Sequence, residues 1–297
     1  MRKNKFSSKG PQLSNQLQNT PRGGKWASKF EEPNASKGKG KADDVKAKKG
    51  LGQHFLKDAS ICIKIKEALL EQEIAQLLEV GPGGGALTQH IHDIPTKDFK
   101  AIELDTEKVN FLLHTYPELQ GKLINADFLE MEIPFSDEFV VVGNFPYNIS
   151  TQIVFKVLDW KLQVPVMIGM FQKEVAERIA AKPNSKAYGI LSVLAQAFYE
   201  VTYLFDVPPE SFTPPPKVMS GVIQMKRKTS FPTMLSEKSF YHIVKMAFGQ
   251  RRKMLRNPLK PYFTAAQLED PIFTKRAENL TFEDFAALTF KMHVAST

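Results

Sequence analysis

Cysteine is almost absent from this chain, with Cys62 the single cysteine among 297 residues. One thiol cannot form an internal disulfide, so we expect a buried free thiol and a protein of the reducing cytoplasm. Long apolar runs are missing too, since no stretch reaches the roughly 18 residues of a membrane-spanning helix. The basic, polar start lacks the apolar segment of a secretory signal. These shortages exclude disulfide scaffolds and predict no membrane partner.

Acidic residues are scarce in two parts of the chain. Residues 1–49 contain 13 Lys and Arg against 4 Asp and Glu, and residues 213–260 contain 11 against 1. Residues 50–212 have the opposite balance, 13 against 22. Clustered cations favour a polyanionic partner, because binding to phosphates releases counterions. A merely solvated face is the alternative that charge alone leaves open.

Residues 1–48 form the first of three expected regions. They are rich in Lys, Gly, Ser, Asn and Gln, and their few apolar residues stand alone. Such a segment cannot bury enough surface to offset the entropy of ordering, so we expect a disordered basic tail. It is either a passive extension or a non-specific RNA-binding arm.

Apolar runs of strand length recur through residues 49–228, the second expected region. Several are continuous, as in strands covered on both faces. Amphipathic helical segments separate them, two of which have Asp105 and Ser150 as expected N-caps. The pattern predicts a doubly wound α/β sheet of seven strands, with ligands at the carboxyl ends of the strands. The expected strands are residues 77–80, 101–104, 123–125, 139–143, 166–170, 201–205 and 221–225.

The third region, residues 229–297, is expected to be a small helical domain. Phe240, Val244 and Phe248 follow helical spacing and should face a core. A basic run follows them directly, and we expect it to contact RNA: Arg251, Arg252, Lys253 and Arg256.

A glycine-rich segment follows the first expected strand. Residues 79–85 read EVGPGGG, and a helix is expected to open at Ala86. Glycines allow the backbone to turn sharply and to approach a ligand closely. Because Gly81, Gly83 and Ala86 also satisfy the dinucleotide-binding pattern, a nicotinamide dehydrogenase is an open alternative at this point.

Two acids follow at the ends of the next two strands. Glu103 closes the second strand, where a carboxylate can accept both hydroxyls of a ribose. Asp127 ends the third strand and could accept the amino group of an adenine. Together with a glycine loop that suits a ligand without pyrophosphate, Asp127 favours S-adenosylmethionine as the cofactor. No metal site is indicated.

The segment GNFPYN, residues 143–148, ends the fourth expected strand. Asn144 offers a carbonyl acceptor, and Pro146 stiffens the loop while a nearby backbone carbonyl is free to accept. Tyr147 offers a flat face on which a base could stack, worth about 1–3 kcal/mol. A turn with a buried tyrosine is the alternative interpretation of the segment alone.

These residue types suit methylation of an adenine amino group. The N6 lone pair is delocalised into the ring, so the nitrogen is a poor nucleophile. Two acceptors on its hydrogens would favour a more tetrahedral nitrogen and aim it at a methyl donor, so that catalysis consists of positioning and electrostatics. The base would have to leave its stack to reach such a loop.

Taken together, several segments resemble the bacterial small-subunit ribosomal RNA adenine dimethyltransferases, the kasugamycin-sensitivity family. The resemblance spans about residues 48–290, which is nearly everything except the tail. It is carried by residues 51–56, 79–85, 102–105, 126–129, 144–147, 172–176, 188–193 and 212–218.

The resemblance implies a Rossmann-like class I methyltransferase sheet with a small C-terminal helical domain. It implies dimethylation of two adjacent adenosines near the 3′ end of 16S rRNA, in the 30S subunit or its precursor, by four methyl transfers. We expect a monomer. The implied cofactor contacts are His54, Leu56, Gly81, Glu103, Asp127 and Asn144, and the implied contacts of the target base are Asn144, Pro146, Tyr147 and Phe212.

One residue departs from the family pattern, which usually has asparagine where this chain has His54. Histidine is larger than asparagine and is titratable, so the cofactor contact of the family's asparagine does not transfer directly to His54. The alternatives to the implied function are a large-subunit rRNA methyltransferase that confers antibiotic resistance, a DNA adenine methyltransferase and a non-catalytic ribosome-assembly factor. Residues 249–257 and 276–281 resemble the small-subunit enzymes and favour that reading.

Overall fold

The computed structural model describes residues 54–292. The expected tail, residues 1–48, lies outside this range. Within the described range no helix is long and apolar enough to cross a membrane.

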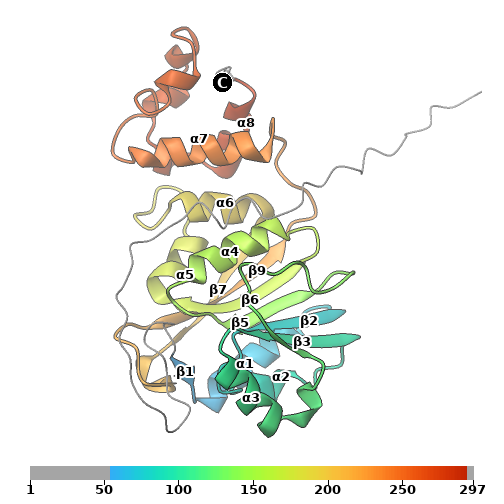
Figure 1. The fold of residues 1–297 in the computed structure, drawn as a ribbon. Helices are drawn as coiled ribbons and strands as arrows, with labels where there is room; N and C mark the ends of the chain where they lie inside the picture. The colour runs from blue at the N-terminus through green and yellow to red at the C-terminus, as the bar shows by residue number, and fades with distance from the viewer. Residues whose placement is uncertain (1–53, 293–297) are drawn as a thin grey trace, which may run out of the picture.

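Seven strands form one sheet in the order β4-β3-β2-β5-β6-β9-β7 (Figure 1). Each overlaps one of the seven expected strands, so the predicted doubly wound α/β sheet is confirmed. β6 and β7 each pair antiparallel with β9, which lies between them, and the other neighbouring pairs are parallel. The bounds are β2 Gln76–Val80, β3 Asp98–Glu103, β4 Leu123–Asn125, β5 Val140–Asn144, β6 Val166–Gln172, β7 Tyr199–Val207 and β9 Ser220–Arg227.

The strand order changes direction at β2. The chain runs from β2 outward through β3 to β4 and then returns to place β5 on the other side of β2. The carboxyl ends of β2 and β5 therefore flank the point where ligands bind in sheets of this kind. A separate two-stranded sheet pairs β1, Phe55–Leu56, with β8, Phe212–Thr213.

Helices cover both faces of the seven-stranded sheet (Figure 1). Apolar residues of the first three helices share one buried cluster, and those of the next three share another. The first three are α1 Ala59–Leu70, α2 Thr88–Ile91 and α3 Thr106–Thr115, and the next three are α4 Ser150–Asp159, α5 Lys173–Ala180 and α6 Ile190–Phe198. Cys62 on α1 is buried, as expected.

Two helix starts differ from the prediction and one agrees with it. The Asp105 carboxylate accepts the N–H of Glu107 and caps α3, as expected. Ser150 is the first residue of α4 rather than its cap, and its hydroxyl donates to the carbonyl of Tyr147. α2 begins at Thr88 instead of Ala86, because the preceding residues form a turn closed by a hydrogen bond from the Gly85 N–H to the Pro82 carbonyl.

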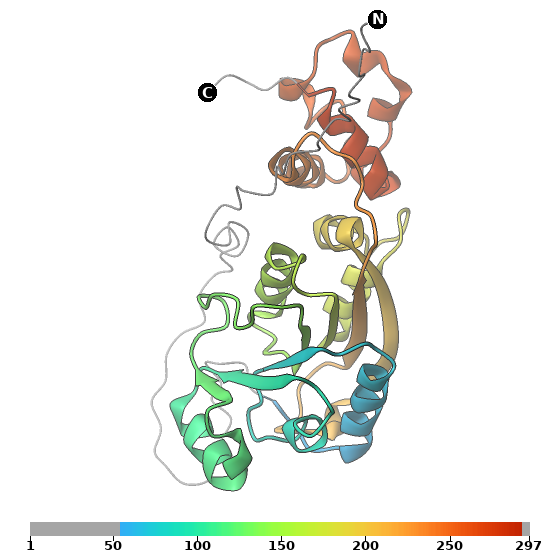
Figure 2. The ribbon, with the colours of Figure 1, turned by 90° about the vertical axis from the view of Figure 1, so that its right-hand side faces the viewer.

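The C-terminal part, from residue 229, is helical, as expected (Figure 2). Phe240, Val244 and Phe285 belong to the same buried cluster as Leu194 on α6, so the apolar core continues from the sheet into these helices. The domain boundary at residues 228–229 stays a prediction. The remaining helices are α7 Glu237–Gly249, α8 Phe282–Thr289 and the short 3₁₀ helices η3 Pro117–Leu119, η4 Pro209–Ser211, η5 Lys260–Tyr262, η6 Gln267–Glu269, η7 Pro271–Thr274 and η8 Ala277–Asn279.

Candidate functional site

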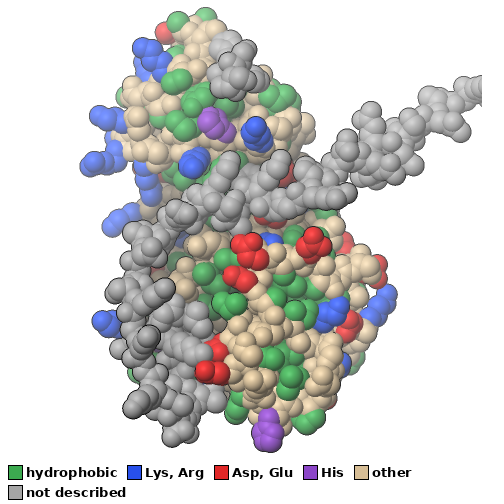
Figure 3. Space-filling view, in the orientation of Figure 1, with side chains coloured by type: hydrophobic (Ala, Val, Ile, Leu, Met, Phe, Trp, Pro, Cys, Tyr) green, Lys and Arg blue, Asp and Glu red, His purple; other side chains and the backbone are tan. Residues whose placement is uncertain are grey.

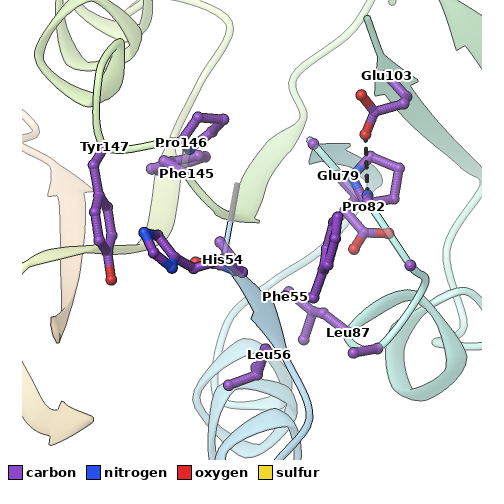
Figure 4. Close-up of a pocket in the computed structure, with 15 residues that line it drawn as sticks. His54, Phe55, Leu56, Glu79, Pro82, Leu87, Glu103, Phe145, Pro146 and Tyr147 are labelled. Carbon is purple, nitrogen blue, oxygen red and sulfur yellow. Dashed lines mark hydrogen bonds between the residues drawn. The ribbon is translucent and has the colours of Figure 1, made fainter. Parts of the chain in front are cut away.

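Two adjoining pockets lie at the carboxyl ends of β2, β3 and β5. Gly81, Glu103 and Pro146 line both of them. The first pocket, shown in Figure 4, also includes His54, Phe55, Leu56, Glu79, Asn144 and Tyr147. The second adds Ile102, Leu104, Asp127, Phe128, Asn148 and Ile149.

The glycines of the 79–85 loop are required by its backbone shape. Gly81, Gly83 and Gly85 have φ angles of 70°, 56° and 82°, in the left-handed region that side chains rarely adopt. A Cβ atom on Gly83 would lie 3.0 Å from the Phe55 ring, and one on Gly85 would lie 2.7 Å from the Tyr116 ring. The loop can therefore keep this path beside the pocket only with glycine.

Glu103 ties the loop to the end of β3. Its Oε2 accepts the Gly83 N–H at 3.0 Å, and its Oε1 accepts the Asp105 N–H at 2.9 Å. Burial raises the pKa of this carboxyl, and the two backbone hydrogen bonds oppose that shift. Because each carboxylate oxygen can accept a second bond, Glu103 retains acceptors for a pair of ribose hydroxyls.

Glu79 is a lining residue that the sequence analysis did not select. Its side chain is almost fully buried at 1% exposure, and its Oε2 has no hydrogen-bond partner. Burial raises its pKa to about 8, with a smaller contribution from the charge of Glu103, and a side-chain hydrogen bond with Thr88 opposes the shift. A buried acid with one oxygen that lacks a hydrogen-bond partner suits a cationic ligand at a pocket wall. The signal in the sequence was an acid inside an apolar strand.

Asp127 lies in the second pocket among apolar side chains. Its Oδ1 accepts the Leu129 N–H at 2.8 Å, which sets the direction of the carboxylate. Oδ2 remains to accept an amino group. Ile102 and Leu104 provide the apolar walls that a flat adenine ring needs, so the pocket fits the expected role.

The Asn144 side chain is oriented by the residue that immediately precedes β1. Its Nδ2 donates to the backbone carbonyl of His54 at 3.0 Å, a bond that identifies the nitrogen end of the amide. Oδ1 is thereby left as the acceptor. The Pro146 carbonyl, expected to be free, instead accepts the Ile149 N–H at 3.2 Å, so only its second lone pair is left for a ligand.

Tyr147 is held at both its ring and its hydroxyl. The hydroxyl and Ser220 Oγ are 2.6 Å apart, and burial raises the pKa of Tyr147. The His54 ring lies beside the Tyr147 ring (Figure 4), with 5.3 Å between the ring centroids and an angle of 30° between the planes. The Nδ1–H of His54 donates to the Pro214 carbonyl at 2.9 Å. His54 thus joins the first pocket through its ring while its backbone orients Asn144.

Phe212 is the expected base contact that the structure does not bring to the pockets. It is 0% exposed and pairs in register with Leu56 across the β1–β8 sheet. Its ring belongs to the apolar cluster under α1 and lines neither pocket. Leu56 itself does line the first pocket.

The expected RNA contacts divide into two kinds. Arg252, Lys253 and Arg256 are exposed, and Lys and Arg side chains gather along one edge of the C-terminal helices (Figure 3). Arg251 instead forms an ion pair with Glu278, with 2.7 Å between Nε and Oε2. RNA contact by the exposed side chains stays a prediction.

Comparison with known proteins gives this site its chemistry. The strand order, the glycine loop and the acids that follow it define a methyltransferase that uses S-adenosylmethionine. Residues 44–291 match the family described as ribosomal RNA adenine dimethylase, and the chain belongs to this family. It is therefore an rRNA methyltransferase, and the expected class I fold and cofactor are confirmed.

Relatives in sequence and in structure agree with this assignment. The ribosomal RNA small subunit methyltransferase A of Flavobacterium johnsoniae is 52% identical over 254 residues, which cover 84% of this chain and 97% of the relative. That of Cytophaga hutchinsonii is 48% identical over 83% and 97%. A dimethyladenosine transferase from Plasmodium falciparum superposes with a TM-score of 0.66 at 26% identity, over 78% and 94%. The 23S rRNA methyltransferase ErmE shares the fold, with a TM-score of 0.63 at 22% identity over 80% and 99%.

Proposed function

We propose that this protein dimethylates the N6 atoms of two adjacent adenosines near the 3′ end of 16S rRNA, using four molecules of S-adenosylmethionine. The carrying observation is the Asn144 amide, whose nitrogen is engaged by the His54 carbonyl and whose Oδ1 is left to accept beside the glycine loop. The names of the curated relatives support the small subunit as the substrate.

The residues present fit the cofactor. Glu103 would hold the ribose hydroxyls and Asp127 the adenine amine. The Glu79 carboxyl, whose Oε2 has no hydrogen-bond partner, would face the cationic methionine portion. Because Gly81 and Gly83 have no Cβ atom, the loop places no side-chain atoms from these positions in the pocket. When bound, S-adenosylmethionine supplies a methyl group activated by the sulfonium.

Asn144 and Pro146 act on the nucleophile. Oδ1 of Asn144 and the second lone pair of the Pro146 carbonyl accept the two hydrogens of the adenine N6. These bonds would draw electron density toward the nitrogen and would hold it in one orientation for methyl transfer. Once it has accepted the methyl group, the nitrogen would be positive and its proton acidic, so water could take the proton without a strong base.

Tyr147 holds the extruded base by stacking. Its hydroxyl bond to Ser220 fixes the ring plane, which lowers the entropy lost when the base is captured. The His54 ring lies next to the Tyr147 ring, so the base would either stack beside the His54 ring or displace it from Tyr147. Phe212 supports the same region from beneath, through Leu56.

The 30S subunit or its precursor is the proposed context, with the protein acting as a monomer in the cytoplasm, where ribosomes assemble. The exposed side chains of Arg252, Lys253 and Arg256 support contact with rRNA phosphates. Because each methyl transfer needs an extruded base, a particle whose 3′ end is accessible suits the site better than one in which it is paired.

Incubation with labelled S-adenosylmethionine and under-methylated 30S particles tests the function. We expect two adjacent adenines of 16S rRNA to gain two methyl groups each when the rRNA is mapped by mass. Large-subunit particles, treated in parallel, should gain none. Methylation of 23S rRNA alone, or of cytosine instead of adenine, would contradict the proposal.

A further inference from the structure

Three segments that are distant in sequence meet at Arg251, just after α7. Its Nε donates to Glu278 Oε2 at 2.7 Å, and its Nη2 donates to the Ser185 carbonyl at 3.2 Å. Glu278 lies on η8, and Ser185 lies in the loop that joins α5 to α6, residues 181–189. Arg251 therefore bridges the C-terminal helices and a loop of the methyltransferase sheet.

Further bonds fasten the same loop. The Asn184 N–H donates to the Glu278 carbonyl at 2.8 Å, and Asn279 Nδ2 donates to Asn184 Oδ1 at 2.8 Å. Asn184 has a φ angle of 69°, a left-handed conformation that asparagine tolerates better than most residues. The loop is thus held in one particular shape. Glu278 contacts it through its backbone carbonyl, and Arg251 contacts it through its guanidinium group.

This shape presents cations to solvent. Lys182 and Lys186 are exposed on the loop, and Arg252 and Arg276 are exposed on the segments bonded to it. None of the four forms an ion pair with another described residue. Side chains of one sign repel each other, so a surface of this kind needs an internal bond to keep its parts together. The Arg251–Glu278 pair supplies that bond and is itself only about one-third exposed.

We propose that Arg251 is a positioning residue that clamps the 181–189 loop, so that Lys182 and Lys186 form one rRNA-contacting surface with Arg252 and Arg276. The inference rests on the proposed function, in that the bound polyanion is rRNA. It reassigns Arg251, which the sequence pattern grouped with the RNA contacts, and it adds Lys182 and Lys186 to them.

The change in RNA affinity when the Glu278 carboxylate is removed has opposite signs for a clamp and for a direct contact by Arg251. If Arg251 bonds to phosphate, removal of the Glu278 carboxylate frees a cation and strengthens RNA binding. If Arg251 is a clamp, removal of Glu278 releases the loop and weakens RNA binding, although the protein becomes more positive. Asn184→Ala loosens the loop without any change of charge, so it should act in the same direction as Glu278→Ala.

The test compares Glu278→Ala and Asn184→Ala with the wild type and with Glu269→Ala, which removes an exposed carboxylate outside the clamp. Affinity for under-methylated 30S particles is measured over a range of salt. Cleavage by trypsin after Lys186 is followed in the free protein. Lys182 precedes proline and resists the protease, so this cut reports loop opening without RNA.

We expect both clamp variants to bind 30S particles about three- to tenfold more weakly and to be cut faster, while Glu269→Ala binds equally or more tightly. Lys182→Ala with Lys186→Ala should weaken binding and reduce the salt slope by about one to two. Tighter binding by Glu278→Ala with unchanged cleavage overturns the clamp. Faster cleavage with unchanged affinity removes the loop from the RNA surface. If the wild type neither binds nor methylates 30S particles, the proposed function fails, while the cleavage rates still test the clamp.

Discussion

Asn144 shows how a single side chain is prepared for chemistry by its neighbours. Its amide could rotate by half a turn, but the His54 carbonyl accepts only from nitrogen and so selects the orientation with Oδ1 free. An aspartate at position 144 would place a carboxylate oxygen against the His54 carbonyl oxygen, two acceptors that repel each other. An alanine would offer the adenine no side-chain acceptor. The function of this residue therefore depends on His54, which immediately precedes β1 and lies 90 residues earlier in the chain.

Asn144→Ala is expected to reduce methyl transfer by about 100-fold or more, because an acceptor that positions the nucleophile is lost. The fold and much of the affinity for 30S particles should persist. Initial rates with labelled cofactor, beside circular dichroism and particle binding, check this expectation. Turnover within a fewfold of the wild type would remove Asn144 from the mechanism.

Glu79 makes the stability of the folded chain depend on pH. Its pKa is raised from an ordinary value of 4.5 to about 8, so between these values the folded chain keeps a proton that the unfolded chain has released. Unfolding then releases a proton, and the contribution of this group to stability falls as the pH rises from 4.5 to 8. Above that window the loss is complete.

Glu79→Gln removes this loss, since glutamine does not ionise. The free energy of unfolding of the variant, relative to the wild type, should rise by about 2–4 kcal/mol between about pH 5 and pH 8 in the absence of cofactor. Urea unfolding at several pH values measures it. Glu269→Gln, at an exposed position, should show no such trend, and parallel curves for Glu79→Gln would refute the assignment.

At the scale of elements, β1 and β8 form the part of the site that sequence patterns could not reveal. Several of the seven main strands, such as β5 and β6, were predictable because they are buried apolar runs, whereas β4 and β7 are only partly buried. The glycine loop was predictable because its conformation demands glycine. A pair of two-residue strands leaves no periodic signal. Its pairing decides that Phe212 faces the core, and the Arg251 ion pair likewise depends on a partner 27 residues away.

Tyr147 and Phe212 should respond differently to truncation because their elements place them differently. Tyr147→Ala is expected to slow turnover by about 5- to 150-fold, from the loss of stacking, with little change in cofactor affinity. Phe212→Ala is expected to lower the free energy of unfolding by about 3–5 kcal/mol, because its ring is fully buried. Calorimetric cofactor binding, turnover and urea unfolding separate the two. Equal destabilisation by both variants would contradict this division.

At the scale of the whole molecule, positive charge is concentrated at residues 1–49 and 213–260, on either side of an acidic body. Charge reversal at Arg252 and Lys253 should weaken binding to 30S particles and reduce the magnitude of the salt slope by about one to two. Filter binding at several salt concentrations tests this. An unchanged slope would place the RNA on another face, and reversal of the exposed Lys97 serves as a distant control.

Removal of residues 1–45 should leave methylation of under-methylated 30S particles within a fewfold of the full chain, because the first of the site residues is His54. A lower affinity at high salt would agree with an auxiliary arm, since cations add non-specific attraction. Time courses with both proteins at matched concentration measure the effect. Complete loss of methylation would show that the tail is part of the enzyme.

The position of β9 has a consequence for folding during synthesis. A chain emerging from the exit tunnel presents β6 and β7 before the strand that must be inserted between them. Until residue 227 is available, the edge of β6 remains open and β7 has no partner in the sheet. Ser220, which anchors the Tyr147 hydroxyl, opens that same strand. The sheet and the base-binding surface are therefore completed at the same time. A nascent or truncated chain that lacks β9 has no complete surface for binding an adenine.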